Sequence, residues 1–223
     1  MSASHVELST DARAASRPPF DRLTIALHWL TLVLILGVIG TALLRESAHD
    51  SAARSLLLQV HRSIGVVIWV VTALRLGWRS LGAQLPPFPG SMSTPHRLAV
   101  RASEYGLYAL LLLQPATGMA QTILRGRAFD LFAVHIPVLL AKNAAPTAAF
   151  HHAHEVGAWC FIALASAHAA AALVHHFNLH DDVLQTMAPA LLQNASAARV
   201  TVSTASGRLP SITQESGDRR ALS

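Results

Sequence analysis

The last of four apolar runs in the sequence extends from His154 to Phe177 and reads HEVGAWCFIALASAHAAAALVHHF. A helix rises about 1.5 Å per residue, so about 20 residues cross a hydrocarbon core of about 30 Å. Three more runs of sufficient length precede it, at residues 23–44, 56–78 and 98–122. None of them alternates with a period of two residues, which argues against strands. The sequence predicts an all-α protein, a transmembrane four-helix bundle.

The composition agrees with a chain that contacts lipid. Of its 223 residues, 52% are hydrophobic and only 13% are charged, against about 25% charged in soluble domains. This deficit argues against a cytosolic globule and against intrinsic disorder. The net charge of +5 would suggest nucleic acid in a soluble protein, but the arginines lie at the ends of apolar runs, so no nucleic-acid partner is expected. The single cysteine, Cys160, excludes an internal disulfide and a multi-cysteine metal site.

The chain divides into three parts. Residues 1–21 form a polar N-terminal segment, residues 22–189 the four-helix transmembrane domain, and residues 190–223 a tail rich in Ser, Thr, Ala and Gln that is expected to be disordered. Arginines favour the N-terminal segment and the second connection, so the positive-inside rule places both termini in the cytoplasm. On the outer side, residues 129–140 are expected to lie on the membrane surface.

Histidines within the apolar runs are the main candidates for function, because ionisable side chains inside a membrane are costly. His154 and His168 are separated by about 21 Å along a helix axis and by about 40° in rotation. They therefore share one helix face, each near a different membrane surface. One metal ion cannot use both, whereas two stacked sites can.

Each of these histidines has a partner at its own depth. His28 lies near the start of the first helix, on the inner side and at the depth of His168. His61 lies near the start of the second helix, on the outer side and at the depth of His154. A pair of imidazoles from facing helices is the ligand set of a non-covalently bound b-type haem. There is no C-x-x-C-H motif, which excludes a covalent c-type haem. The sequence predicts two haem b groups, stacked across the bilayer with their irons about 20 Å apart.

Two neighbours of His61 are candidate cofactor-binding residues. Gly65 lies one turn after His61 on the same face, where a porphyrin edge needs room, although small residues also serve helix packing. Arg62 could pair with a haem propionate through charge-assisted bonds or extend to lipid headgroups.

Several stretches, in order along the chain, resemble the prokaryotic cytochrome b561 family, over roughly residues 20–189. They are Arg22–Trp29 (RLTIALHW), His61–Gly65 (HRSIG), Pro115–Gly118 (PATG), His154-Glu155, Ala167–His176 (AHAAAALVHH) and the ending from Asp181 to Pro189. The family comprises four-helix inner-membrane cytochromes with two haem b groups, each ligated by two histidines. By position, its four ligands fall on His28, His61, His154 and His168.

The resemblance also implies a function. The family is associated with electron transfer involving the quinone pool, and one member passes electrons from superoxide to ubiquinone. The chain is therefore expected to be a bacterial inner-membrane cytochrome that transfers single electrons to or from quinone. If it is an enzyme, it is a quinone- or superoxide-linked oxidoreductase. The electron donor and the oligomeric state, a homodimer included, stay open.

Three other roles remain open from the sequence. A cytochrome b subunit serving a hydrogenase or a formate dehydrogenase would copurify with an iron–sulfur partner. A transition-metal transporter would need carboxylates and methionines along a polar pore, and these helices offer few beyond Glu104 and Glu155. An inert membrane anchor leaves four depth-matched histidines without a purpose.

Overall fold

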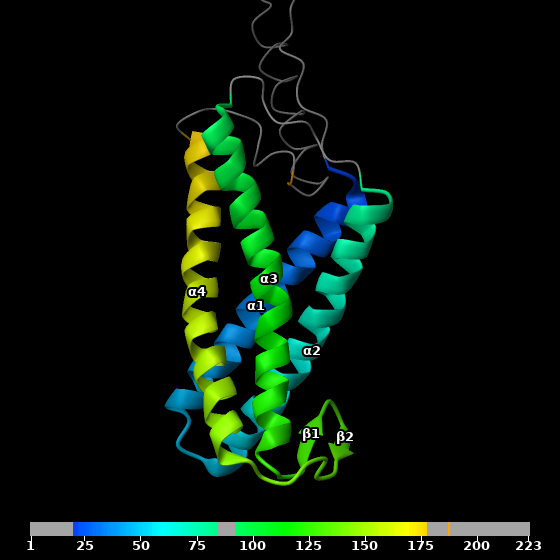
Figure 1. The fold of residues 1–223 in the computed structure, drawn as a ribbon, viewed down its shortest axis with the longest axis vertical. Coiled ribbons are helices and arrows are strands. Elements are labelled where there is room, and N and C mark those ends of the chain that lie inside the picture. The colour runs from blue at the N-terminus through cyan, green and yellow to red at the C-terminus, as the bar shows by residue number, and fades with distance from the viewer. Residues whose placement is uncertain (1–19, 84–91, 178–186, 188–223) are drawn as a thin grey trace, which may run out of the picture. The chain divides into compact units, whose positions relative to one another are not determined.

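The computed structural model describes residues 20–83, 92–177 and 187, which form four helices and one hairpin of short strands (Figure 1). The N-terminal segment up to residue 19 and the predicted tail, residues 190–223, lie outside the described residues. The elements, in chain order, are α1 (Arg22–Ser47), α2 (Ser51–Leu81), α3 (Thr94–Leu124), β1 (Phe129–Leu131), β2 (Val134–Ile136) and α4 (Ala144–Phe177).

The helices run alternately up and down, so the start of α1 and the end of α4 lie at the same end of the bundle (Figure 1). We call this the terminal end. The opposite end carries the strands β1 and β2 and the short connection between α1 and α2, and we call it the hairpin end.

The helices extend beyond the apolar runs that predict them. Asp21 caps α1 by accepting from the Thr24 N–H at 2.9 Å, and Asp50 caps α2 by accepting from the Ala53 N–H at 2.7 Å. Such caps satisfy N–H groups that the first turn leaves unpaired, so α2 begins at Ser51 rather than at residue 56. The expected start of the last helix, at residue 154, is also wrong: α4 begins at Ala144, because the alanine-rich segment before His154 continues the helix.

The connection between α3 and α4 contains two strands that were not predicted from the sequence. Residues expected to lie on the membrane surface include an antiparallel hairpin in which Phe129 pairs with Ile136. Phe132 adopts a positive φ of 54° at its turn, and its N–H donates to Ser63 Oγ of α2 at 2.7 Å. The Phe129 side chain is buried. The hairpin therefore packs against the start of α2, close to His61.

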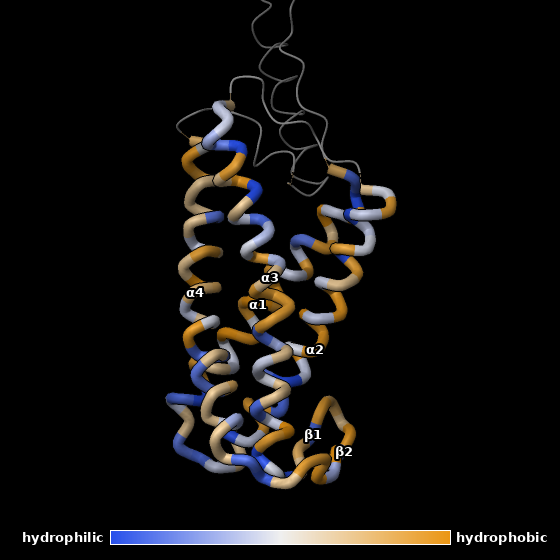
Figure 2. Tube along the Cα trace, in the orientation of Figure 1, coloured by the Kyte–Doolittle hydropathy of each residue, from blue (hydrophilic) through white to orange (hydrophobic). Residues whose placement is uncertain are grey.

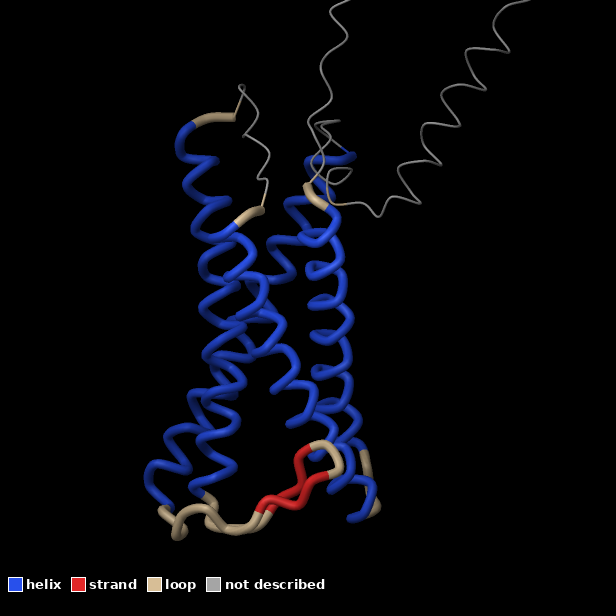
Figure 3. The backbone as a smooth tube through the Cα atoms, turned by 90° about the vertical axis from the view of Figure 1, so that its right-hand side faces the viewer, coloured by secondary structure: helices blue, strands red, loops and turns tan. Residues whose placement is uncertain are grey.

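The helices associate as two antiparallel pairs. α1 packs along α2, α3 packs along α4, and α2 and α3 join the two pairs. Figure 3 shows the helical bundle from the side, with the strands at one end. The buried centre consists of Ile68, Leu111 and Phe161, from three different helices. Among the described residues, α4 approaches α1 and α2 much less closely than it approaches α3.

All four helices are long and apolar enough to cross a membrane, and apolar residues continue along them in Figure 2. Only 6% of the most apolar window of α1 and of α4 is buried inside the protein. Large side chains such as Val33, Leu36 and Trp159 are exposed. Such wide apolar surfaces are unfavourable in water and suit a lipid environment.

Candidate functional site

Two of the predicted histidines face each other at the hairpin end. His61 of α2 and His154 of α4 have ring centroids 6.2 Å apart, with their planes at 78°. A bond from a metal to an imidazole nitrogen is about 2 Å long, so two rings that share one ion have centroids about 6 Å apart. The spacing of these rings therefore suits one ion held between them. Both residues are half-buried.

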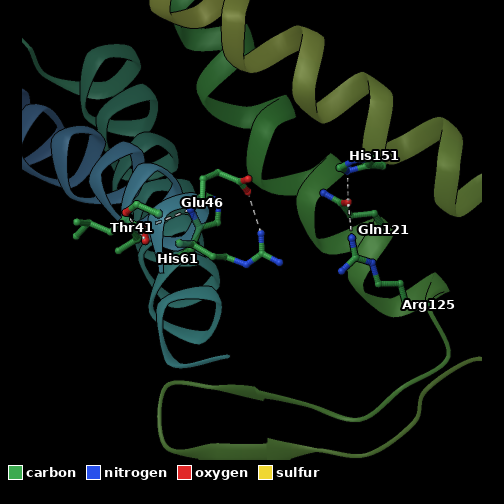
Figure 4. A network of polar contacts seen from close by, with 9 residues as sticks. Thr41, Glu46, His61, Gln121, Arg125 and His151 are labelled. Atoms are coloured by element: carbon green, nitrogen blue, oxygen red, sulfur yellow. Dashed lines mark hydrogen bonds and ion pairs between the residues drawn. The ribbon is translucent and has the colours of Figure 1, made fainter. Parts of the chain in front are cut away.

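His61 is oriented by α1. Its Nδ1 lies 3.0 Å from the Val38 carbonyl oxygen and 3.2 Å from Thr41 Oγ1; Figure 4 shows the contact with Thr41. A carbonyl oxygen can only accept, so Nδ1 carries the hydrogen and donates it. The Nε2 atom then keeps its lone pair. Metal-binding histidines commonly donate their other ring N–H to a carbonyl in this way.

His154 is oriented by α3 in the same manner. Its Nδ1 lies 2.9 Å from the Gln114 carbonyl oxygen and 3.2 Å from Thr117 Oγ1. Gly118 leaves room for the His154 ring, because a Cβ at this position would lie only 3.0 Å from Cε1 of His154. His154 therefore also has an Nε2 free to bind a metal.

The other two predicted histidines lie nearer the terminal end and are held less closely. His28 of α1 is half-buried and His168 of α4 is exposed, and the two are close enough to interact electrostatically. Among the described residues they show no ring contact like that of the hairpin-end pair. Arg75 of α2 contacts residues of two other helices at this end. Its Nη2 is 3.4 Å from Nδ1 of His28 on α1, and its guanidinium lies 5.2 Å from the centre of the Tyr108 ring on α3.

Arginines gather beside the hairpin-end pair. The Arg62 guanidinium lies 5.5 Å from the centre of the Phe129 ring, and Arg45 and Arg125 are close enough to interact with it electrostatically. The Nε atoms of Arg45 and Arg62 are buried without a hydrogen-bond partner among the described residues. These atoms could donate to an anionic group.

A second polar chain lies across α3 and α4 at the same end. Gln121 Oε1 accepts from Arg125 at 3.4 Å and lies 3.1 Å from His151 Nδ1 (Figure 4).

The glycines next to this region leave space. A Cβ built at Gly65, one turn from His61, would meet no atom of another described segment within 4 Å, and the same holds at Gly40 of α1. Among the described residues, no three His, Cys, Asp or Glu side chains form a metal-binding group. Paired imidazoles, open glycine faces and unpaired guanidinium atoms together fit a planar metal–macrocycle that brings its own equatorial ligands and carries carboxylates.

Several residues of this region were not predicted from the sequence. Thr41 and Thr117, which contact the histidines, and Arg45, beside Arg62, were not singled out. At the terminal end, Arg79 of α2 forms a bidentate ion pair with Glu104 of α3, with Nη2 to Oε2 at 3.1 Å. In the sequence, each of these residues is visible as a polar residue in an apolar helix. Such a position indicates a candidate functional residue but does not identify its partner.

This ion pair borders a small pocket of about 30 Å³. Its lining includes Thr24, Arg75, Trp78 and Tyr108.

Comparison with known proteins agrees with these features. A family model described as prokaryotic cytochrome b561 matches residues 19–190. Cytochrome b561 homolog 2 of Escherichia coli (strain K12) is 29% identical over 168 residues, which cover 74% of this chain and 88% of that protein. Cytochrome b561 homolog 1 of the same organism is 27% identical over 174 residues, or 76% of this chain and 97% of that protein.

A protein of Yersinia pestis named probable superoxide oxidase CybB is 28% identical over 176 residues, covering 76% of this chain and 96% of its own length. The family match spans most of the chain and includes all four helices. The chain belongs to the prokaryotic cytochrome b561 family and is a prokaryotic membrane cytochrome that binds b-type haem.

Proposed function

We propose that this chain holds two b-type haems, one between His61 and His154 and one between His28 and His168, and carries single electrons between them across the membrane. The observation that carries the proposal is the hairpin-end pair, with ring centroids 6.2 Å apart. Both Nδ1 atoms of this pair are bonded to carbonyls, which leaves both Nε2 atoms available to one iron.

The surrounding residues would support the haem at the hairpin end. The buried Nε atoms of Arg62 and Arg45 provide donors for a propionate, whose charge would also reduce the repulsion among the arginines. The open face at Gly65 provides room for the macrocycle. At the other pair, Arg75 beside His28 supplies a positive charge that favours a reduced iron over an oxidised one.

The ligand set limits the chemistry. A bound haem supplies a one-electron redox couple. A haem held by two histidines would favour electron transfer over binding and activation of O₂. His154 and His168 lie about 21 Å apart along α4. The chain therefore offers one redox site near each surface of the bilayer.

The donor, the acceptor and the orientation belong to the same proposal. We infer that the chain lies in the bacterial inner membrane with both termini in the cytoplasm, with residues 22–189 as its cytochrome domain. Quinone is the proposed lipid-soluble partner. Superoxide is a candidate donor, because a relative is named a probable superoxide oxidase.

The proposal is tested with purified protein in mild detergent. The haems are first reduced with dithionite, excess reductant is removed, and a short-chain ubiquinone is added while the haem absorbance is followed. Reoxidation of both haems within seconds supports quinone-linked electron transfer, and haems that stay reduced refute the quinone part. A flux of superoxide that reduces oxidised haem, and that superoxide dismutase blocks, supports superoxide as the donor. An iron–sulfur protein that copurifies stably would instead favour a cytochrome b subunit of a hydrogenase or formate dehydrogenase.

A further inference from the structure

We propose that Thr41 and Thr117 are matched positioning residues that fix the ring planes of the two hairpin-end histidines. Each threonine hydroxyl acts together with the carbonyl three residues before it, and we call each such combination a clamp. The clamps hold the rings of His61 and His154 nearly perpendicular. This inference rests on the proposed ligation of a haem by these two histidines.

The clamp on α1 is a closed set of three polar atoms. Thr41 Oγ1 donates to the Val38 carbonyl oxygen at 2.8 Å. Because a hydroxyl has one hydrogen, its lone pairs remain for the Nδ1–H of His61, at 3.2 Å. The same Nδ1 lies 3.0 Å from the Val38 oxygen. The ring N–H of His61 is therefore directed at two oxygens that are hydrogen-bonded to each other.

The clamp on α3 repeats this arrangement with the same spacing along the helix. Thr117 Oγ1 lies 2.9 Å from the Gln114 carbonyl oxygen and 3.0 Å from that of Leu113, so its hydrogen is shared between the two. His154 Nδ1 lies 2.9 Å from the Gln114 oxygen and 3.2 Å from Thr117 Oγ1. α1 and α3 therefore hold the rings of His61 and His154 by the same arrangement of hydrogen bonds.

The hydrogen bonds of the two clamps fix the planes of the His61 and His154 rings. Rotation about the Cβ–Cγ bond of a histidine has a broad energy profile, so a ring needs a partner to fix its plane. Two oxygens at different positions on one edge of the ring provide it, and the observed angle between the planes is 78°. Perpendicular imidazoles interact equally with the two iron d orbitals of π symmetry. A low-spin ferric haem with such ligands gives a strongly anisotropic EPR signal, whereas parallel rings give a less anisotropic one.

The test uses Thr41→Val and Thr117→Val in the full chain. Valine keeps the shape of threonine and removes the hydroxyl. Thr41→Ser and Thr117→Ser keep a hydroxyl and are the conservative variants. Thr31→Val is the matched control, because Thr31 makes a similar bond to a backbone carbonyl of α1, to Leu27 O at 2.6 Å, and has no histidine partner in the part of the chain that the structure describes. EPR of the oxidised protein, haem per chain and the rate of haem transfer to apomyoglobin are measured.

We expect the parent to show a strongly anisotropic signal that His61→Ala removes, which assigns it to the hairpin-end haem. Each valine variant should shift this signal toward lower anisotropy and lose that haem about 10-fold faster. The serine variants and Thr31→Val should resemble the parent.

Valine variants with an unchanged signal and haem-loss rate would refute the clamps, as would an equal change in Thr31→Val. A hairpin-end haem that has the less anisotropic signal already in the parent would refute them too. Failure of the proposed function looks different: the parent then binds no haem, or His61→Ala retains both haems.

Discussion

His61 and His154 face each other from α2 and α4, and each is hydrogen-bonded through Nδ1 to a different neighbouring helix, His61 to α1 and His154 to α3. All four helices therefore meet at one pair of imidazoles. Apart from this pair, the two helix pairs are joined mainly along α2 and α3. A metal–macrocycle bound here would connect the two halves of the bundle, so binding of the cofactor and stability of the fold should be coupled.

Replacement of His61 or His154 by alanine should remove the haem at the hairpin end and leave the other haem in place. Each pair is expected to bind its haem independently, because His154 and His168 are about 21 Å apart. The measurement is haem per chain, which should fall by half in either variant. His152→Ala, an exposed position on the same helix, is the control and should keep the parent value. Loss of both haems, or of neither, would contradict the pairing.

Gly65→Leu should reduce occupancy of the hairpin-end haem. The space beside Gly65 is open in the protein, so a leucine there should be tolerated by the fold and should compete only with the macrocycle. Gly77→Leu is the matched control: its site on α2 is equally open but lies about 160° around the helix from His61. Equal haem content in the two variants would show that the macrocycle does not use the Gly65 face.

Arg62→Ala should lower the reduction potential of the hairpin-end haem by about 30–60 mV, since a nearby positive charge stabilises the reduced iron. The other haem should be unaffected in a redox titration followed by absorbance. Arg127→Ala removes an exposed positive charge at the same end and should change the potential little. An equal shift in both variants would mean that Arg62 acts only through the overall surface charge.

Glu104→Gln should destabilise the bundle by about 2 kcal/mol, because it leaves the half-buried Arg79 without its ionic partner. The expected result is a lower midpoint of thermal unfolding in detergent. Reversal of the pair, Arg79→Glu with Glu104→Arg, should recover part of the loss. Glu46→Gln is the control: this side chain is 75% exposed in its pair with Arg45, where ion pairs contribute little. A Glu104→Gln variant as stable as Glu46→Gln would contradict a structural role for the pair.

The sequence predicted the features that follow from hydrophobicity and helical period. Four apolar runs predicted four membrane-spanning helices, and the comparison with known proteins confirms the family that the histidine-containing stretches resemble. The assignment of His28, His61, His154 and His168 as ligands stays a prediction. The structure does bring His61 and His154 face to face, which their depth alone suggested.

The features that were not predicted depend either on local helix propensity or on contacts between distant segments. The start of α4 at Ala144 follows from local helix propensity, which a hydropathy profile does not report. The hairpin at Phe129–Ile136 is stabilised by α2, through Ser63 and Gln59, which bond to Phe132. The proposed role of Thr41 and Thr117 depends on their contacts with the rings of His61 and His154, which lie on other helices. A sequence shows such residues as polar positions in apolar helices, but their partners are set by tertiary packing.

The amount of haem b bound per folded chain tests the proposal of two haems directly, and is determined by the pyridine haemochrome method on protein purified in mild detergent. If each histidine pair holds one haem, the value is two. One haem per chain would contradict the assignment of one of the pairs, and a folded chain without haem would contradict haem binding by either pair.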